Sequence, residues 1–137
     1  MIRKHIYEIK AEKIVNKFPQ KRDCYKELKD YVLNENNSKI SKILALYGLR
    51  RTGKSTMLEQ LSIKLKEKNI PFKYYYCGNN ATFSELENNL NEDLKNNIGI
   101  VFINEVTMIK DLIENSAILA DYYNKQGMKI VLSGYFP

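Results

Sequence analysis

The 137-residue sequence predicts an α/β fold built on a mostly parallel sheet. After residue 38, short apolar runs alternate with longer amphipathic segments, which is the pattern of strands joined by crossover helices. The run at 98–103 is almost uninterruptedly apolar, as a strand covered on both faces requires. We therefore expect this run at the centre of the sheet.

The first 38 residues are expected to form a helical segment ahead of the sheet. They are rich in charged, helix-permissive residues and are interrupted at Pro19. Apolar and aromatic residues repeat at helical intervals over 23–33. The sequence therefore divides into a helical lead-in at 1–38 and an α/β core at 39–137.

The core elements are expected in alternating order. Apolar runs bounded by polar residues or glycine predict strands at 43–47, 72–76, 98–103 and 129–133. Apolar residues at three- and four-residue intervals predict helices at 54–68, 84–95 and 111–123. Gly127 suits the turn out of the last helix. The acidic residues of the second helix are expected on its solvent face: Glu85, Glu87, Glu92 and Asp93.

Composition excludes several classes of protein. No apolar run approaches the roughly 20 residues of a membrane-spanning helix, and the N-terminus alternates charged with apolar residues, so we expect no membrane partner and a cytoplasmic location. Cys24 and Cys77 lie far apart without a zinc-type spacing and are expected to be reduced packing residues. The net charge of +6 comes mostly from dispersed lysines. A solvated surface is favoured, and a nucleic-acid-binding face is the alternative.

Residues 48–55 read Gly-Leu-Arg-Arg-Thr-Gly-Lys-Ser and match the phosphate-binding pattern GxxxxGK[ST]. The match follows an apolar strand and leads into an amphipathic helix, which is the setting in which this loop works. Gly48 and Gly53 let backbone N–H groups turn inward around phosphate oxygens. Lys54 should reach the terminal phosphates, and the Ser55 hydroxyl should ligate magnesium.

We assign nucleotide contacts to the loop and to the start of its helix: Gly48, Arg50, Arg51, Thr52, Gly53, Lys54, Ser55 and Thr56. Arg50 and Arg51 could face a phosphate, a partner protein or solvent, and solvent is the default interpretation. The competing interpretation of the motif is a simple glycine turn with a solvated Lys54.

Asn104 and Glu105 directly follow the central apolar strand. Ligands of parallel sheets lie beyond the carboxyl ends of the strands, which places both residues beside the phosphate-binding loop. ATP-hydrolysing proteins with this loop normally have Asp and then Glu here. Asn104 offers an oxygen to magnesium but no negative charge, and Glu105 is a candidate general base. The alternative is an ordinary strand exit.

Two further features concern the nucleotide. Ser133 ends the fourth predicted strand, where it could touch the γ-phosphate or the attacking water. The segment 124–127 starts like a guanine-reading NKxD motif, but Gly127 replaces the carboxylate, which disfavours GTP. The three tyrosines at 74–76 are expected to pack in the core and between strands.

The segments 47–56, 102–107 and 131–134 together resemble the prokaryotic AAA-type ATPases with a GxRRxGK[ST] loop. The resemblance covers roughly residue 39 to the end and implies a P-loop NTPase three-layer sandwich. It also implies ATP and Mg as cofactors, with Glu105 and Lys54 catalytic, Ser133 as a polar sensor, and Ser55 and Asn104 at the metal.

This sequence departs from the family pattern in two respects. Asn104 replaces the usual Asp, and the fifth strand, helical lid and C-terminal domain of the family are not found in these residues, so we expect a truncated core. An arginine finger would come from a neighbouring subunit, which implies a homo-oligomer or a partner protein.

The leading hypothesis is therefore an ATP-binding core that hydrolyses ATP slowly or only when completed by missing segments. The alternatives are a non-catalytic ATP-responsive switch, a nucleic-acid-binding module, and a small-molecule kinase. The kinase hypothesis is not supported by an arginine-rich lid in this sequence.

Overall fold

The computed structural model describes residues 4–10, 14, 25–33, 43–48 and 54–135. At 25–28, 46–48, 54–56 and 135 only the backbone is described. All structural statements below concern these residues.

In the described part of the chain, five strands form one sheet in the order β1-β3-β4-β5-β2. Strands β2, β3, β4 and β5 run parallel, and β1 joins the edge of β3 in the antiparallel direction. The strands span Ile6–Glu8 (β1), Leu44–Gly48 (β2), Lys73–Cys77 (β3), Ile100–Asn104 (β4) and Lys129–Tyr135 (β5). The predicted mostly parallel α/β sheet is confirmed, with its four parallel strands at the predicted places.

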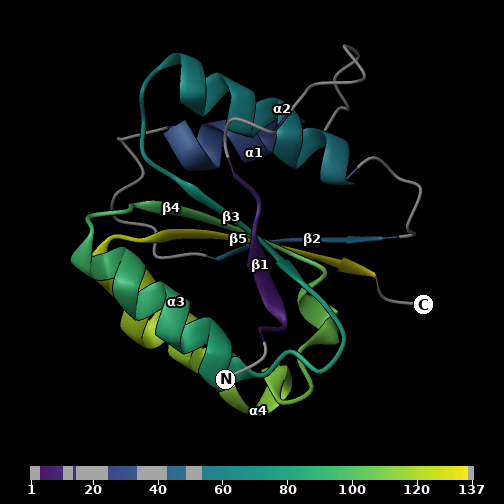
Figure 1. Cartoon of the computed structure of the whole chain (residues 1–137). Coiled ribbons are helices and arrows are strands. Elements are labelled where there is room, and N and C mark those ends of the chain that lie inside the picture. The colour runs from purple at the N-terminus through teal and green to yellow at the C-terminus, as the bar shows by residue number, and fades with distance from the viewer. Residues whose placement is uncertain (1–3, 11–13, 15–24, 34–42, 49–53, 136–137) are drawn as a thin grey trace.

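Helices cover both faces of the sheet (Figure 1). On one face lie α1 (Tyr25–Leu33) and α2 (Lys54–Glu67), and on the other lie α3 (Phe83–Lys95) and α4 (Leu112–Ile118). The described residues also contain short helices: the 3₁₀-helix η3 (Val106–Met108), the π-helix η4 (Leu119–Tyr123) and the 3₁₀-helix η5 (Asn124–Gln126).

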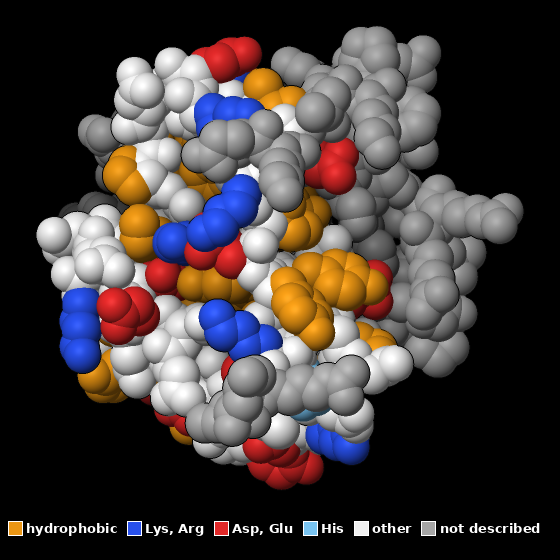
Figure 2. Space-filling model, in the orientation of Figure 1, with side chains coloured by type: hydrophobic (Ala, Val, Ile, Leu, Met, Phe, Trp, Pro, Cys, Tyr) orange, Lys and Arg blue, Asp and Glu red, His pale blue; other side chains and the backbone are white. Residues whose placement is uncertain are grey.

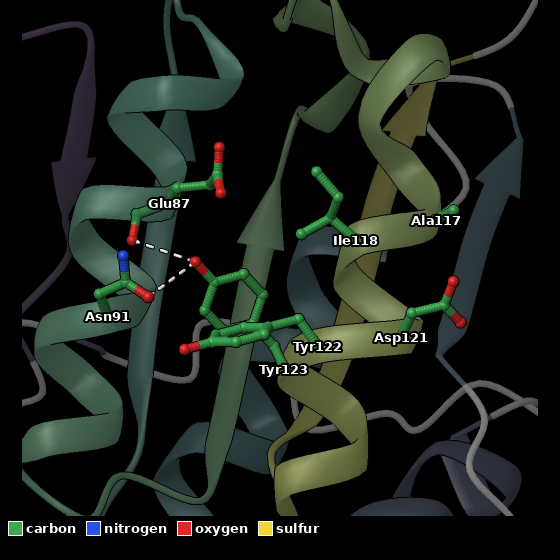
Figure 3. A pocket seen from close by; sticks show the side chains of 7 residues that line it. All are labelled: Glu87, Asn91, Ala117, Ile118, Asp121, Tyr122 and Tyr123. Carbon is green, nitrogen blue, oxygen red and sulfur yellow. Dashed lines mark hydrogen bonds between the residues drawn. The ribbon is translucent and has the colours of Figure 1, made fainter.

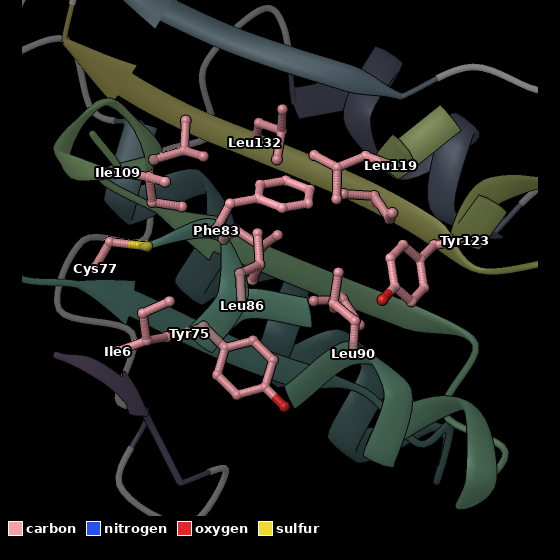
Figure 4. Close-up of a cluster of buried hydrophobic side chains, with 14 of the residues drawn as sticks. Ile6, Tyr75, Cys77, Phe83, Leu86, Leu90, Ile109, Leu119, Tyr123 and Leu132 are labelled. Carbon is pink, nitrogen blue, oxygen red and sulfur yellow. The ribbon is translucent and has the colours of Figure 1, made fainter. Parts of the chain in front are cut away.

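The central strand β4 is buried along its whole length. It contributes side chains to two hydrophobic clusters, one on each face of the sheet. Val101 and Ile103 enter the cluster under α3, shown in Figure 4, whereas Ile100 and Phe102 enter the cluster under α2. Side chains alternate between the two faces of a strand, so a strand covered on both faces must be apolar at every position. The predicted sheet centre is therefore correct.

The helical expectation for the N-terminal segment is wrong at Ile6–Glu8, which form β1. Ile6 lies opposite Cys77 in β3, and the carboxylate of Glu85 accepts hydrogen bonds from the backbone N–H groups of His5 (2.8 Å) and Ile6 (2.6 Å). Pairing with the open edge of β3 outweighs the local helix propensity of a short charged segment. Helix α1 lies within the predicted helix at 23–33.

The acidic residues of α3 are not all on its solvent face as expected. Glu85 holds the start of β1, and Asp93 is 2% exposed. Asp93 Oδ2 accepts a 2.6 Å hydrogen bond from the Tyr75 hydroxyl. Burial raises the pKa of Asp93, while the Tyr75 hydrogen bond and the charge of Lys73 act in the opposite direction. The prediction holds for Glu92, which is exposed.

The single helix predicted at 111–123 is divided into α4 and η4, and η5 follows directly after it. Gly127 follows with φ of 95°, a left-handed conformation that glycine adopts without steric cost, so the predicted turn is confirmed. Burial raises the pKa of the Cys77 thiol to about 12, which supports its role as a packing residue. Cys24 lies outside the described residues.

Basic and acidic side chains are intermixed on the surface seen in Figure 2. Glu8 pairs with Lys10 (3.3 Å) and with Lys73 (3.0 Å). Within the described residues, no helix has both the length and the apolar composition needed to cross a membrane.

Candidate functional site

The predicted phosphate-binding loop lies between the end of β2 at Gly48 and the start of α2 at Lys54. The strand predicted before the motif and the helix predicted after it are therefore both present. Helix α2 has no acidic residue in its first turn, so the partial positive charge of its N-terminus is not neutralised there. Such a helix start attracts anions.

Several predicted contact residues lie outside the description. Residues 49–53, which include Arg50, Arg51, Thr52 and Gly53, are not described, and Lys54, Ser55 and Thr56 are placed by their backbone alone. Their nucleotide contacts stay predictions.

Asn104 occupies the carboxyl end of β4 and is 6% exposed. Its Oδ1 accepts a 2.7 Å hydrogen bond from the Ser133 hydroxyl, and its Nδ2 donates a 3.3 Å hydrogen bond to the Tyr74 hydroxyl. The amide is therefore held by the two strands that flank β4. Amide oxygen and hydroxyl oxygen are donors of the kind that magnesium accepts.

Ser133 connects this amide to the strand that leads to the loop. It is completely buried and lies opposite Leu46 of β2, two residues before Gly48. Two of the predicted site side chains are thus in direct contact at the edge of the sheet where β2 ends.

Glu105 follows β4 in a left-handed backbone conformation, with φ of 59° and ψ of 42°. Residues with a Cβ adopt this region at a cost, and such residues are concentrated at functional sites. Glu105 turns the chain from β4 into η3 and is half-buried. Because glutamate does not favour this backbone conformation, the surrounding structure must hold Glu105 in it at the end of the strand.

Gly134 brings β5 close to η3. A Cβ at Gly134 would lie 2.9 Å from Cγ2 of Thr107, which is closer than real Cβ atoms approach. Gly134, directly after Ser133, is therefore packed against Thr107, two residues after Glu105.

Sequence reasoning missed two members of this arrangement. Tyr74 was expected only to pack, and it does, with its ring at right angles to Phe102 at 6.1 Å, but its hydroxyl also holds Asn104. Burial raises the pKa of the Tyr74 hydroxyl, which is neutral at physiological pH. A tyrosine rather than a phenylalanine in a buried strand was the available signal. No pattern in the sequence indicated the contact between Gly134 and Thr107.

Within the described residues, no three His, Cys, Asp or Glu side chains gather to hold a metal ion.

A model described as an AAA domain matches residues 40–134. The chain belongs to the AAA domain family. It is an AAA-type ATPase core. No curated protein matches this AAA domain. Among solved structures, PCH-2 of C. elegans is similar with 15% identity and a TM-score of 0.36, over 83% of this chain and 35% of that chain. The AAA domain thus spans about a third of the length of PCH-2.

Proposed function

We propose that this AAA domain binds ATP with magnesium and hydrolyses it slowly, or only when completed by further segments of chain. The proposal is supported by one observation: β2, which ends at Gly48 just before the motif, pairs in parallel with β5, and Ser133 of β5 donates a hydrogen bond to Asn104 at the end of β4, next to Glu105. In parallel sheets, ligands bind at this edge.

The residues take the roles that the sequence assigns. The loop amides and Lys54 bind the phosphates, with Arg50 and Arg51 as further contacts, as in the GxRRxGK[ST] subgroup of prokaryotic AAA-type ATPases. Ser55 and Asn104 would hold magnesium, which neutralises phosphate charge when bound. Glu105 orients and deprotonates the attacking water, and Ser133 contacts the γ-phosphate.

Asn104 explains why hydrolysis is slow. A neutral amide holds a divalent cation less firmly than a carboxylate does. The lid and the arginine finger that the family resemblance implies are assigned to further segments of chain or to a second subunit. Because ATP is the ligand, we place the protein in the cytoplasm.

Titration calorimetry with ATP and magnesium tests the binding. Lys54→Ala removes a charge-assisted contact of about 1.5–3 kcal/mol, so we expect roughly 10- to 100-fold weaker affinity. Equal affinity in the variant and the wild-type protein would refute the proposal.

Asn104 also favours a second function, in which ATP orders the domain as a ligand and is not consumed. Phosphate release distinguishes the two. Glu105→Gln keeps the size of the side chain and removes the base, so it measures the background. Release above this background supports hydrolysis, and ATP binding without such release supports the switch.

A further inference from the structure

A groove lies between α3 and the helical segment formed by α4 and η4 (Figure 3). Its volume is about 610 Å³, within the range of about 300–1,000 Å³ that is typical of ligand sites. It lies on the face of the sheet opposite α2 and is separate from the candidate nucleotide site. Both walls contribute to its lining: Glu87, Asn91, Ala117, Ile118, Asp121, Tyr122 and Tyr123.

The base of the groove is fixed by hydrogen bonds between its walls. The Tyr123 hydroxyl donates to Oδ1 of Asn91 at 2.8 Å and lies 3.4 Å from the carbonyl oxygen of Glu87. Tyr123 is 1% exposed, and the Tyr122 ring packs against it edge to face with centroids 4.8 Å apart. These contacts hold η4 against α3, so the groove is preformed.

The π-helix η4 places two consecutive tyrosines in this wall. The backbone N–H of Asn124 bonds to the carbonyl of Leu119, which is the wider turn of a π-helix. Tyr123 turns into the core while Tyr122 stays 52% exposed beside the groove. Such π-turns are rare and are often found at functional sites.

The lining combines negative charge with apolar surface. Glu87 on α3 and Asp121 on η4 belong to opposite walls, and within the described residues neither carboxylate forms an ion pair. Ile118 points toward α3 between them (Figure 3). The lining contains no basic residue.

An arginine or lysine side chain matches this combination. Its aliphatic stem would pack on Ile118 and on the Tyr122 ring, while its charged head would reach the carboxylates. A cation over a tyrosine face gains further electrostatic energy. Nucleic acid is disfavoured, because its phosphates would face two carboxylates.

We propose that this groove docks a segment of a partner protein that carries arginine or lysine between apolar residues. The adjoining α4 extends the apolar surface, because Ile113 on it is 87% exposed. The partner is thus recognised by a cationic anchor in the groove and by apolar flanks along α4.

The test uses a fluorescein-labelled peptide of alternating arginine and leucine and measures its anisotropy on titration with the protein. The double variant Glu87→Gln, Asp121→Asn removes both charges with little change of shape. We expect it to bind roughly tenfold or more weakly than the wild-type protein, since hydrogen bonds to charged groups are lost. Tyr122→Ala should also weaken binding.

The matched control is Glu92→Gln, Glu114→Gln, which changes the net charge equally at exposed positions outside the groove. It should bind like the wild-type protein, and a labelled glutamate–leucine peptide should not bind. Equal weakening by both double variants would show unspecific attraction and overturn the proposal, as would no binding of the arginine peptide to the wild-type protein.

Sedimentation velocity tests a second copy as the occupant. If the wild-type protein self-associates and the groove variant does not, the groove is a self-interface and the proposal is wrong. Lys54→Ala should leave peptide binding unchanged, so the outcome is independent of the nucleotide proposal.

Discussion

The Ser133 hydroxyl donates a 2.7 Å hydrogen bond to Oδ1 of Asn104 and joins the carboxyl ends of β5 and β4. On the other side, Asn104 donates to the Tyr74 hydroxyl of β3 at 3.3 Å. Three neighbouring strands are thus tied together by side chains at the edge of the sheet where β2 ends. An aspartate at 104 would fit the same surroundings, because both hydroxyls are able to donate to a carboxylate.

Asn104→Asp is therefore expected to strengthen ATP binding in the presence of magnesium. The carboxylate adds a negative charge at the proposed metal position, and the hydroxyls of Ser133 and Tyr74 satisfy it. Titration calorimetry with and without magnesium measures the effect, and the gain should appear only with the metal. If affinity is unchanged or lower with magnesium, Asn104 is not at the metal site.

Tyr74→Phe should lower the free energy of unfolding by about 1–2 kcal/mol, because the buried hydrogen bond from Nδ2 of Asn104 to the Tyr74 hydroxyl is lost. Tyr76→Phe makes the same chemical change in the same strand at a side chain that is 42% exposed, and it should stay within about 0.5 kcal/mol of the wild-type protein. Urea denaturation compares the two. Equal effects would mean that the Tyr74 hydroxyl does not contribute through Asn104.

Much of the fold could be predicted because hydrophobic periodicity is a local signal. The apolar run at 98–103 indicated the buried strand β4, and the apolar run at 43–47 and the helical repeat at 54–68 indicated β2 and α2. β1 could not be predicted, because three residues become a strand only when the edge of β3 is available. The same holds for Asp93, whose charge indicated exposure while its contact with Tyr75 buries it.

The candidate site was predictable at its strand ends and not in its internal contacts. Asn104, Glu105 and Ser133 stand out because each is polar after an apolar run. The hydrogen bond of Asn104 to Tyr74 depends on the register of β3 against β4, and the contact of Gly134 with Thr107 depends on how η3 folds back on β5. Neither is encoded by residue spacing along the chain.

Gly134→Ala should destabilise the protein by about 1–3 kcal/mol through overpacking, because the new Cβ would lie 2.9 Å from Cγ2 of Thr107. Thr107→Ser removes that methyl group and keeps the hydroxyl, 3.4 Å from the new Cβ. The double variant should recover most of the loss in thermal denaturation. Additive losses in the double variant would show that this contact is not the cause.

Glu105→Gly is expected to raise the free energy of unfolding by about 0.5–1 kcal/mol. Glycine relieves a left-handed strain of order 1–3 kcal/mol, which its greater freedom in the unfolded chain partly offsets. Glu105→Gln keeps the Cβ and should not gain stability, while both variants should lose phosphate release. A glycine variant no more stable than the glutamine variant would refute the strain at Glu105.

Asp93→Asn should change stability in a pH-dependent way. Burial raises the pKa of Asp93 above its ordinary value of 3.8, so the folded wild-type protein binds this proton more tightly than the unfolded chain does. The resulting stabilisation is full below pH 3.8 and is lost as the pH rises through the folded-state pKa. Asparagine keeps an oxygen for the Tyr75 hydroxyl and does not titrate. The variant should therefore gain stability relative to the wild-type protein as the pH rises.

Urea denaturation at a series of pH values from acid to neutral measures this difference. Glu92→Gln, which changes the exposed carboxylate next to Asp93, is the control for the general effect of removing one negative charge from α3. Because Asp93 is 2% exposed and contacts the Tyr75 hydroxyl at 2.6 Å, its protonation state is tied to packing under α3. A stability difference that does not vary with pH would mean that Asp93 is not held at a raised pKa by its burial beneath that helix.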